Sequence, residues 1–254
     1  MTTRHLQPEA LPKRLQALGW AKDVYARGPL PAAGPAVAIV GARRATQRGM
    51  DTAHALSRHL SLRGVQVVSG GALGIDGAAH RGALAANAPT TVVLGSGCDI
   101  AYPDRHQKLF ETVLASGGTI LSELPDGSQP RRGTFLARNK LIAALADVVV
   151  VVEAETKSGS LSTAAHAWKL GRVVVAYPGT GGCELLLARG AGIAETETDV
   201  DAALAGEPRM RIVASDDDQI VRDAIASGAL SVAEIVTRTR LPVRVVLRAL
   251  ARLS

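Results

Sequence analysis

Glycine, serine and arginine recur together in short segments, each of which follows a run of apolar residues. Glycine lets the backbone approach an anion closely, serine adds a neutral hydrogen-bond donor, and arginine adds a charged donor that can bind two oxygens. Tight turns would explain many of the glycines but not the serines and arginines beside them. We therefore expect a phosphate-binding crevice, whose candidate residues are Gly41, Arg43, Arg44, Ser69, Gly70, Gly71, Gly95, Ser96, Gly97, Ser158, Gly159 and Ser160.

A second segment, residues 131–140, combines four cations with one aromatic residue and one amide. Cations that hold the backbone and an aromatic ring that stacks on a base are what a single-strand binder requires. If a helix begins near Phe135, then Phe135, Arg138 and Asn139 share one face, and Lys140 follows them. On the alternative interpretation Phe135 belongs to the core and the arginines form a solvated turn, and the segment by itself leaves both interpretations open.

Three further polar residues could orient groups near the crevice or act as bases. Asp76 and His80 are four residues apart on one predicted helical face, and Glu153 ends an apolar run. A carboxylate in a first helical turn caps backbone N–H groups, and His80 could simply be hydrogen-bonded to Asp76. We favour structural, orienting roles for all three and assign no catalytic residue.

Several enzyme and cofactor motifs are missing from the sequence. The first loop reads GARRAT rather than GxGxxG, and neither GxxxxGK[ST] nor GxSxG occurs. The two cysteines, Cys98 and Cys183, have no CxxC spacing, which argues against a zinc site and against a disulfide framework. We expect no cofactor and no metal.

Six short β-branched runs alternate with helical patterns from residue 37 onward. The predicted helices lie at about 47–62, 74–86, 104–115, 135–144 and 160–170, and the predicted strands at 37–40, 65–69, 91–94, 118–121, 147–152 and 172–176. The runs VVVVV and VVVA are continuously apolar, as strands buried on both faces of a parallel sheet require. Strand–helix alternation predicts an α/β fold with a doubly wound, mostly parallel, extended Rossmann-like sheet. Ligands of such sheets bind beyond the carboxyl ends of the strands, where the glycine-rich segments lie.

The chain divides into four predicted parts. Residues 1–34 read as a short helical lead-in, and residues 35–206 as the Rossmann-like DNA-binding domain. Residues 207–218 are polar and form a predicted linker. Residues 219–254 read as three short helices in a helix-turn-helix, winged-helix-like domain that stops where a wing would begin.

The formal charge of +6 favours an anionic partner, although residues 35–206 are close to neutral, so the fold must gather their cations. A mild cationic excess that only aids solubility explains the charge equally well. The first twenty residues lack the apolar run of a secretory signal, and residues 143–152 are too short to span a bilayer. We expect a cytoplasmic protein with no membrane partner.

Taken together, these segments resemble the DNA processing protein A family, the Smf-like proteins of natural transformation. The resemblance covers about residues 9–192 and rests on many segments in the family's order, which are VAIVGARRATQRG (37–49), VSGGALGIDGAAHRGAL (68–84), VLGSGCDIAYPDRHQKL (93–109), GGTILSELPDG (117–127), FLARNKLIAAL (135–145), VVVVEAETKSGSLSTAAHAWKLGRVVVAYPG (148–179) and ELLLARGA (184–191).

The resemblance implies a homodimer that binds and protects incoming single-stranded DNA and loads the RecA recombinase. It implies that Arg43 and the Arg138–Lys140 group lie in the DNA-binding pocket, beside the loops 69–71 and 158–160. This sequence departs from the family pattern at both ends, because it begins too late for the N-terminal helical domain of many members and has no wing. Glu184 also stands where an amide is expected.

Two alternatives from other classes remain. The fold resembles nucleotide phosphoribohydrolases of the lonely-guy type, which carry PGGxGTxxE after the strand equivalent to 148–152. Here the same position reads SGSLST, without a glutamate where their catalytic carboxylate falls. A nucleotide-sensing domain is the other alternative, since a pocket of this kind could hold one nucleotide. We favour a non-enzymatic DNA-binding protein.

Overall fold

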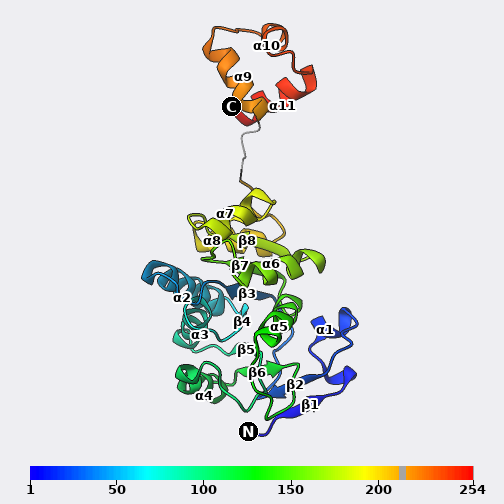
Figure 1. The fold of residues 1–254 in the computed structure, drawn as a ribbon, viewed down its shortest axis with the longest axis vertical. Helices are drawn as coiled ribbons and strands as arrows, with labels where there is room; N and C mark the ends of the chain where they lie inside the picture. The colour runs from blue at the N-terminus through cyan, green and yellow to red at the C-terminus, as the bar shows by residue number, and fades with distance from the viewer. Residues whose placement is uncertain (212–215, 254) are drawn as a thin grey trace. The chain divides into compact units, whose positions relative to one another are not determined.

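The computed structural model describes residues 1–211 and 216–253 and divides the chain into two compact units, Met1–Met210 and Arg211–Ser254 (Figure 1). The division falls inside the segment 207–218 that we predicted to be a linker. Residues 212–215 of that segment lie outside the described residues. Each unit has its own buried core, so we describe the two units separately.

The first unit is built on one nine-stranded sheet with the order β1-β2-β6-β5-β4-β3-β7-β8-β9. The run from β6 to β9 is parallel throughout, and β1 and β2 extend it antiparallel beyond β6. The central strand β3 has the next three strands of the chain on one side and the last three on the other, which confirms the predicted doubly wound, mostly parallel sheet. The strands are β1 Arg4–Leu6, β2 Val24–Arg27, β3 Ala36–Val40, β4 Gln66–Ser69, β5 Thr90–Leu94, β6 Thr119–Ser122, β7 Val148–Val151, β8 Val173–Ala176 and β9 Gly192–Ile193.

Helices cover both faces of the sheet. Short 3-10 turns at Pro8–Ala10 and Asp104–His106 precede α1 and α4. The helices α2 Gln47–Leu62, α3 Ile75–Ala85, α4 Gln107–Ala115 and α8 Glu197–Leu204 pack on one face, and α1 Lys13–Ala17, α5 Arg132–Ala144, α6 Ser160–Lys169 and α7 Gly181–Ala188 pack on the other.

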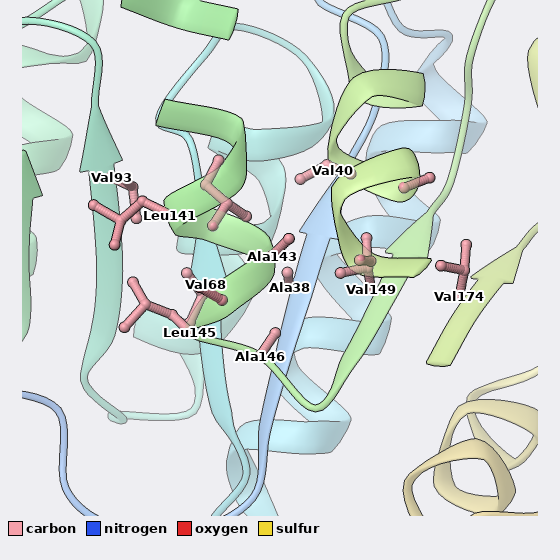
Figure 2. Packing of buried hydrophobic residues seen from close by; sticks show 14 of the residues in the cluster. Ala38, Val40, Val68, Val93, Leu141, Ala143, Leu145, Ala146, Val149 and Val174 are labelled. Carbon is pink, nitrogen blue, oxygen red and sulfur yellow. The ribbon is translucent and has the colours of Figure 1, made fainter. Parts of the chain in front are cut away.

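The apolar strands bury alternate side chains on the two faces, as the continuous apolar runs predict. On β3, Val37 and Ile39 join the core beneath α2 and α3, whereas Ala38 and Val40 join the core beneath α5 and α6. Figure 2 shows the second of these cores, where Leu141 of α5 lies beside Val93 of β5. Every residue of β3 is buried, so this strand holds the centre of the sheet rigidly.

The lead-in 1–34 differs from our expectation of a short helical segment. It contains α1, but also β1 and β2, which complete the edge of the sheet. Val24 and Ala26 of β2 are buried and Tyr25 is half-buried, an alternation that is too short to identify a strand before its partner β6 is known. The structure also adds α7, α8 and β9 after residue 180, and α5 begins at Arg132 rather than Phe135.

The second unit contains three helices, α9 Asp216–Ala226, α10 Val232–Thr239 and α11 Val243–Leu253. Its core comprises Val221, Ala224, Ala229, Ile235, Val246 and Ala249. The Ser231 hydroxyl accepts a hydrogen bond from the Glu234 N–H and so caps α10. The structure therefore has the small all-helical C-terminal part that the sequence predicts.

No helix among residues 1–211 and 216–253 combines the length and the apolar character needed to cross a bilayer.

Candidate functional site

A large hollow of the first unit lies beyond the carboxyl ends of β3 and β7. It has a volume of about 1000 Å³ and is lined by the segments that follow these two strands, by residues of α5 from Arg132 to Ile142 and by the start of α6. These two adjacent strands lead to opposite halves of the sheet, so the hollow occupies the switch point where ligands of doubly wound folds bind. We call it the switch-point cavity.

The cavity lining is rich in cations. Three carboxylates also line it, namely Asp76, Glu153 and Glu155. The six cations of the lining are Arg43, Arg44, Arg131, Arg132, Arg138 and Lys157. Five of these cations are exposed, and only Arg138 is buried. The near-neutral domain therefore has a local excess of positive charge at this cavity, which favours an anionic ligand.

Glu153 holds the start of α2 in place at the cavity wall. Its carboxylate accepts a hydrogen bond of 2.9 Å from the Thr46 N–H and a second one from the Thr46 hydroxyl. Thr46 in turn caps α2 by accepting a hydrogen bond from the Gly49 N–H. A Cβ on Gly49 would overlap the Glu153 carboxylate, so glycine is required there for this contact. Because Glu153 is engaged in this way, it orients the backbone beside the cavity.

Serines and an amide shape the start of α6. The hydroxyls of Ser158 and Ser160 lie 2.7 Å apart, and the Asn139 side-chain amide donates a hydrogen bond of 3.1 Å to the Gly159 carbonyl. All four residues line the cavity. The start of α6 and the positive end of its dipole therefore border the same space as the arginines, which favours an anion there, and the Ser158 hydroxyl accepts the hydrogen bond of the first helical N–H group, that of Ser160.

Two aromatic rings and one guanidinium form a cluster in the cavity lining. The Arg43 guanidinium carbon lies 5.0 Å from the centroid of the Phe135 ring. The centroids of the Tyr102 and Phe135 rings are 5.2 Å apart. Tyr102 is 40% exposed, so one ring remains accessible to a base. Our sequence analysis missed Tyr102. An aromatic residue in the segment after the third predicted strand was the available signal.

Arg138 and Asp76 form a buried pair at the cavity floor. The Arg138 Nη2 lies 4.0 Å from the Asp76 Oδ2, and its Nη1 donates a hydrogen bond of 2.5 Å to the Val93 carbonyl. Burial lowers the pKa of Arg138 to about 10, and burial raises the pKa of Asp76 against the opposing effect of the Arg138 charge. Arg138 was predicted to lie in the DNA-binding pocket, and it does line the cavity, but only 6% of it is exposed and its contacts are with Asp76 and the carbonyl of Val93 on β5.

Two of the predicted glycine-rich loops, 69–71 and 95–97, are closed by neighbouring groups. A Cβ on Gly70 would overlap the Arg138 guanidinium, and Gly71, with φ of +70°, packs against Phe110. The Ser69 hydroxyl donates to the Ile39 carbonyl at 2.6 Å, inside the core. These three residues therefore serve close packing, and the structure corrects their prediction as members of the cavity lining.

The loop 95–97 is closed in the same way. A Cβ on Gly95 would lie 2.9 Å from Phe135, a Cβ on Gly97 would lie 2.7 Å from the Pro125 carbonyl, and the buried Ser96 hydroxyl donates to the Ile100 carbonyl at 2.9 Å. None of these three predicted residues lines the cavity. By contrast, Gly41, Arg43, Arg44, Phe135, Asn139, Ser158, Gly159 and Ser160 do line it.

Two further predicted residues lie elsewhere. Lys140 is exposed on another side of α5, where its Nζ lies 5.0 Å from the centroid of the Trp20 ring. His80 is buried, and its Nδ1 lies 2.9 Å from the Thr90 hydroxyl rather than bonding to Asp76 as expected. Because that hydroxyl donates to the Val67 carbonyl, the His80 Nδ1 is the donor, and His80 is a neutral core residue.

No cluster of three or more histidine, cysteine or acidic side chains suited to a metal ion occurs within the part of the chain that the structure describes.

Comparison with known proteins adds a family to this geometry. A family model described as DNA recombination-mediator protein A matches residues 5–205. A DNA processing protein DprA of Mycobacterium tuberculosis is 42% identical over 217 residues, which are 79% of this chain and 56% of the relative. DprA of Streptococcus pneumoniae is 38% identical over 172 residues, which are 65% of this chain and 60% of the relative. The chain spans about half the length of the curated relatives it matches.

Solved structures have a similar fold. One similar structure is that of DNA processing protein A from Helicobacter pylori, which is described as giving insights into its single-stranded DNA binding mode. It has a TM-score of 0.72 at 32% identity, and the match covers 82% of this chain and 98% of the Helicobacter pylori chain. DprA of Streptococcus pneumoniae has a TM-score of 0.70 at 30% identity, over 83% of this chain and 75% of its own. A molybdenum cofactor binding protein from Rippkaea orientalis, 21% identical with a TM-score of 0.54, shares the fold.

Proposed function

Because this chain belongs to the DNA recombination-mediator protein A family, we propose that it binds single-stranded DNA in the switch-point cavity. The observation that carries the proposal is the convergence of five exposed cations, the start of α6 and the Tyr102–Phe135 ring pair on one hollow. The single-stranded DNA binding described for the Helicobacter pylori protein, whose fold is similar, supports it.

In this proposal the phosphates of the strand lie along Arg43, Arg44, Arg132 and Lys157. Each charge-assisted contact releases a counterion, so the affinity depends on salt rather than on base identity. The exposed face of Tyr102 offers a base a stacking surface that tolerates any sequence. Phe135 lies beneath Arg43 and holds the guanidinium in place.

The test is the substitution Arg43→Ala, which removes one phosphate contact and leaves the buried framework unchanged. We expect weaker binding of oligo-dT and a salt dependence, log K against log salt, that is shallower by about 0.7 units for the lost contact. Fluorescence anisotropy at several salt concentrations measures both quantities.

Arg58→Ala is the matched control, because Arg58 is an exposed cation on α2 that does not line the cavity. It should bind as the unchanged protein does. Equal salt slopes for Arg43→Ala, Arg58→Ala and the unchanged protein would contradict the assignment of the cavity.

We further propose that the protein acts as a homodimer that protects incoming DNA and hands it to the RecA recombinase in the cytoplasm. Two cavities in one particle would lengthen the path of the strand and raise avidity. Light scattering should then give twice the chain mass of 26.3 kDa, and a mass of 26.3 kDa at working concentration would contradict the dimer.

We also propose that the protein binds DNA without catalysing a reaction on it. Two of the three carboxylates at the cavity are engaged, since Glu153 accepts hydrogen bonds from Thr46 at the start of α2 and Asp76 is held beside Arg138. Incubation with nucleoside monophosphates should release no free base. Release of base would support a phosphoribohydrolase instead, and tight binding of a mononucleotide with weak binding of oligo-dT would support a nucleotide sensor.

A further inference from the structure

A second group of basic side chains lies outside the switch-point cavity, on the outer side of α5 and α6. Lys140 comes from α5, His166 and Lys169 come from the last turn of α6, and Lys22 comes from the segment before β2. Trp20 lies among them. We call these five residues the lysine patch.

Contacts hold two of the lysines of the patch in place. The Lys140 Nζ lies 5.0 Å from the centroid of the half-buried Trp20 ring, which is the geometry of a cation–π interaction. The Lys22 Nζ lies 2.9 Å from the Glu123 Oε2, whose side chain is only 9% exposed. Burial and then the charges of Lys169, Lys140 and Lys22 lower the pKa of His166, so all three ammonium groups lie close enough to act on this imidazole.

The patch carries positive charge that its own helices do not balance. Neither α5 nor α6 contains an aspartate or a glutamate, and the carboxylate that the structure pairs with the patch is Glu123. Repulsion between ammonium groups costs free energy unless an anion joins them. The lysine patch therefore favours binding of an anionic partner.

The patch is continuous with the switch-point cavity along one stripe of α5. Arg132 and Leu136 line the cavity and are exposed, and Lys140 follows them at the same helical spacing. A rise of 1.5 Å per residue places Lys140 about 12 Å along the helix from Arg132. An extended strand that leaves the cavity over Arg132 would meet Lys140 next.

We propose that the lysine patch is a second contact surface for the phosphate backbone of single-stranded DNA, which the strand reaches along α5 after it leaves the switch-point cavity. This inference rests on the proposed function. It assigns to Trp20 the role of holding the Lys140 ammonium over its ring, so that Lys140 is positioned before the strand arrives.

The experiment compares a short oligo-dT of about 6 nucleotides, which fills the cavity, with a long one of about 20 nucleotides, which extends beyond it. The double variant Lys140→Gln/Lys169→Gln should bind the short oligonucleotide as the unchanged protein does. Its salt slope for the long oligonucleotide should be shallower by about 1.4 units, for two lost contacts. The control Arg58→Gln/Lys108→Gln removes two exposed cations from α2 and α4 and should leave both slopes unchanged.

A second measurement uses the unchanged protein. Lysine acetylation followed by mass spectrometry should find Lys140 and Lys169 protected by the long oligonucleotide but not by the short one, and Lys108 equally reactive in both. Equal long-oligonucleotide slopes for the double variant and the unchanged protein, or unprotected lysines, would overturn the inference and would favour an acidic protein as the partner of the patch. The proposed function itself fails separately, if the unchanged protein does not bind the short oligonucleotide.

Discussion

Arg138 and Lys140 illustrate how strongly the role of a residue depends on its direction. They are two positions apart on α5, and a helix turns by about 100° per residue, so their side chains diverge. Arg138 points into the sheet and fills the space above Gly70, whereas Lys140 points outward to Trp20. One cation therefore became part of the cavity floor, and the other lies in a different basic surface.

His80 is a second case in which burial decides the chemistry, and it leads to a prediction about acid stability. Burial, and then the charges of His106, Arg138 and Arg81, lower the pKa of His80 from 6.5 to about 3. The unfolded chain therefore binds a proton near pH 6.5 that the folded chain does not bind. His80 should destabilise the fold progressively as the pH falls from 6.5 toward 3.

We expect His80→Gln to reduce the slope of the unfolding free energy against pH between about pH 3 and pH 6.5. The reduction should be about 1.4 kcal/mol per pH unit, because the unfolded variant takes up one proton fewer. Urea unfolding at a series of pH values measures the slope. Ile39→Val is the control, because it weakens the core but keeps His80. An unchanged slope in the histidine variant would show that His80 is protonated in the folded protein.

At the scale of elements, glycines allow two helices to approach each other. Gly82 of α3 lies against the backbone of α2, and a Cβ there would overlap the His54 carbonyl and lie 2.9 Å from the Ser57 Cβ. These two helices carry the segments that follow β3 and β4. Their close packing therefore sets the position of one cavity wall.

We predict that Gly82→Ala lowers the free energy of unfolding by about 1–3 kcal/mol, because backbone cannot move aside as a flexible side chain can. Gly133→Ala provides the comparison, since nothing lies within 4 Å of an added Cβ on this glycine of α5. Alanine also favours helix over glycine, so that variant should be at least as stable as the unchanged protein. Chemical denaturation measures the free energy of unfolding of both variants. An equal decrease in the two variants would contradict the packing argument.

At the scale of the whole molecule, the two units have separate cores and the switch-point cavity belongs to the first unit alone. All of its lining residues lie between Val40 and Thr180. The second unit is a three-helix element with a core of six buried residues. Binding of a short strand should therefore not require it.

We predict that residues 1–210 alone bind the short oligo-dT with the affinity of the full chain. Circular dichroism establishes that the shortened chain is folded, and fluorescence anisotropy gives its affinity. Loss of short-strand binding by a folded shortened chain would mean that the second unit contributes to the site.

The sequence by itself determined the features that depend on neighbouring residues. Continuous apolar runs identified strands buried on both faces, helical periodicity placed α2 at its observed limits, and glycine-rich segments marked the edge of the sheet where the cavity lies. The cap that Ser231 forms on α10 is likewise a local hydrogen bond, between residues three positions apart. The doubly wound order followed because alternating strands and helices have few ways to form a parallel sheet.

Only the tertiary structure decided which glycine-rich loops are open and which are filled. Phe135 and Arg138 close two of them because α5 packs across the sheet at one particular rotation, and that rotation depends on residues far apart in the chain. The same packing brought Tyr102 to Phe135, separated Lys140 from the cavity and gave β2 its place on β6. The direction of a side chain and the pairing of distant strands depend on many contacts between residues far apart in the sequence. A local pattern of residues therefore does not predict them.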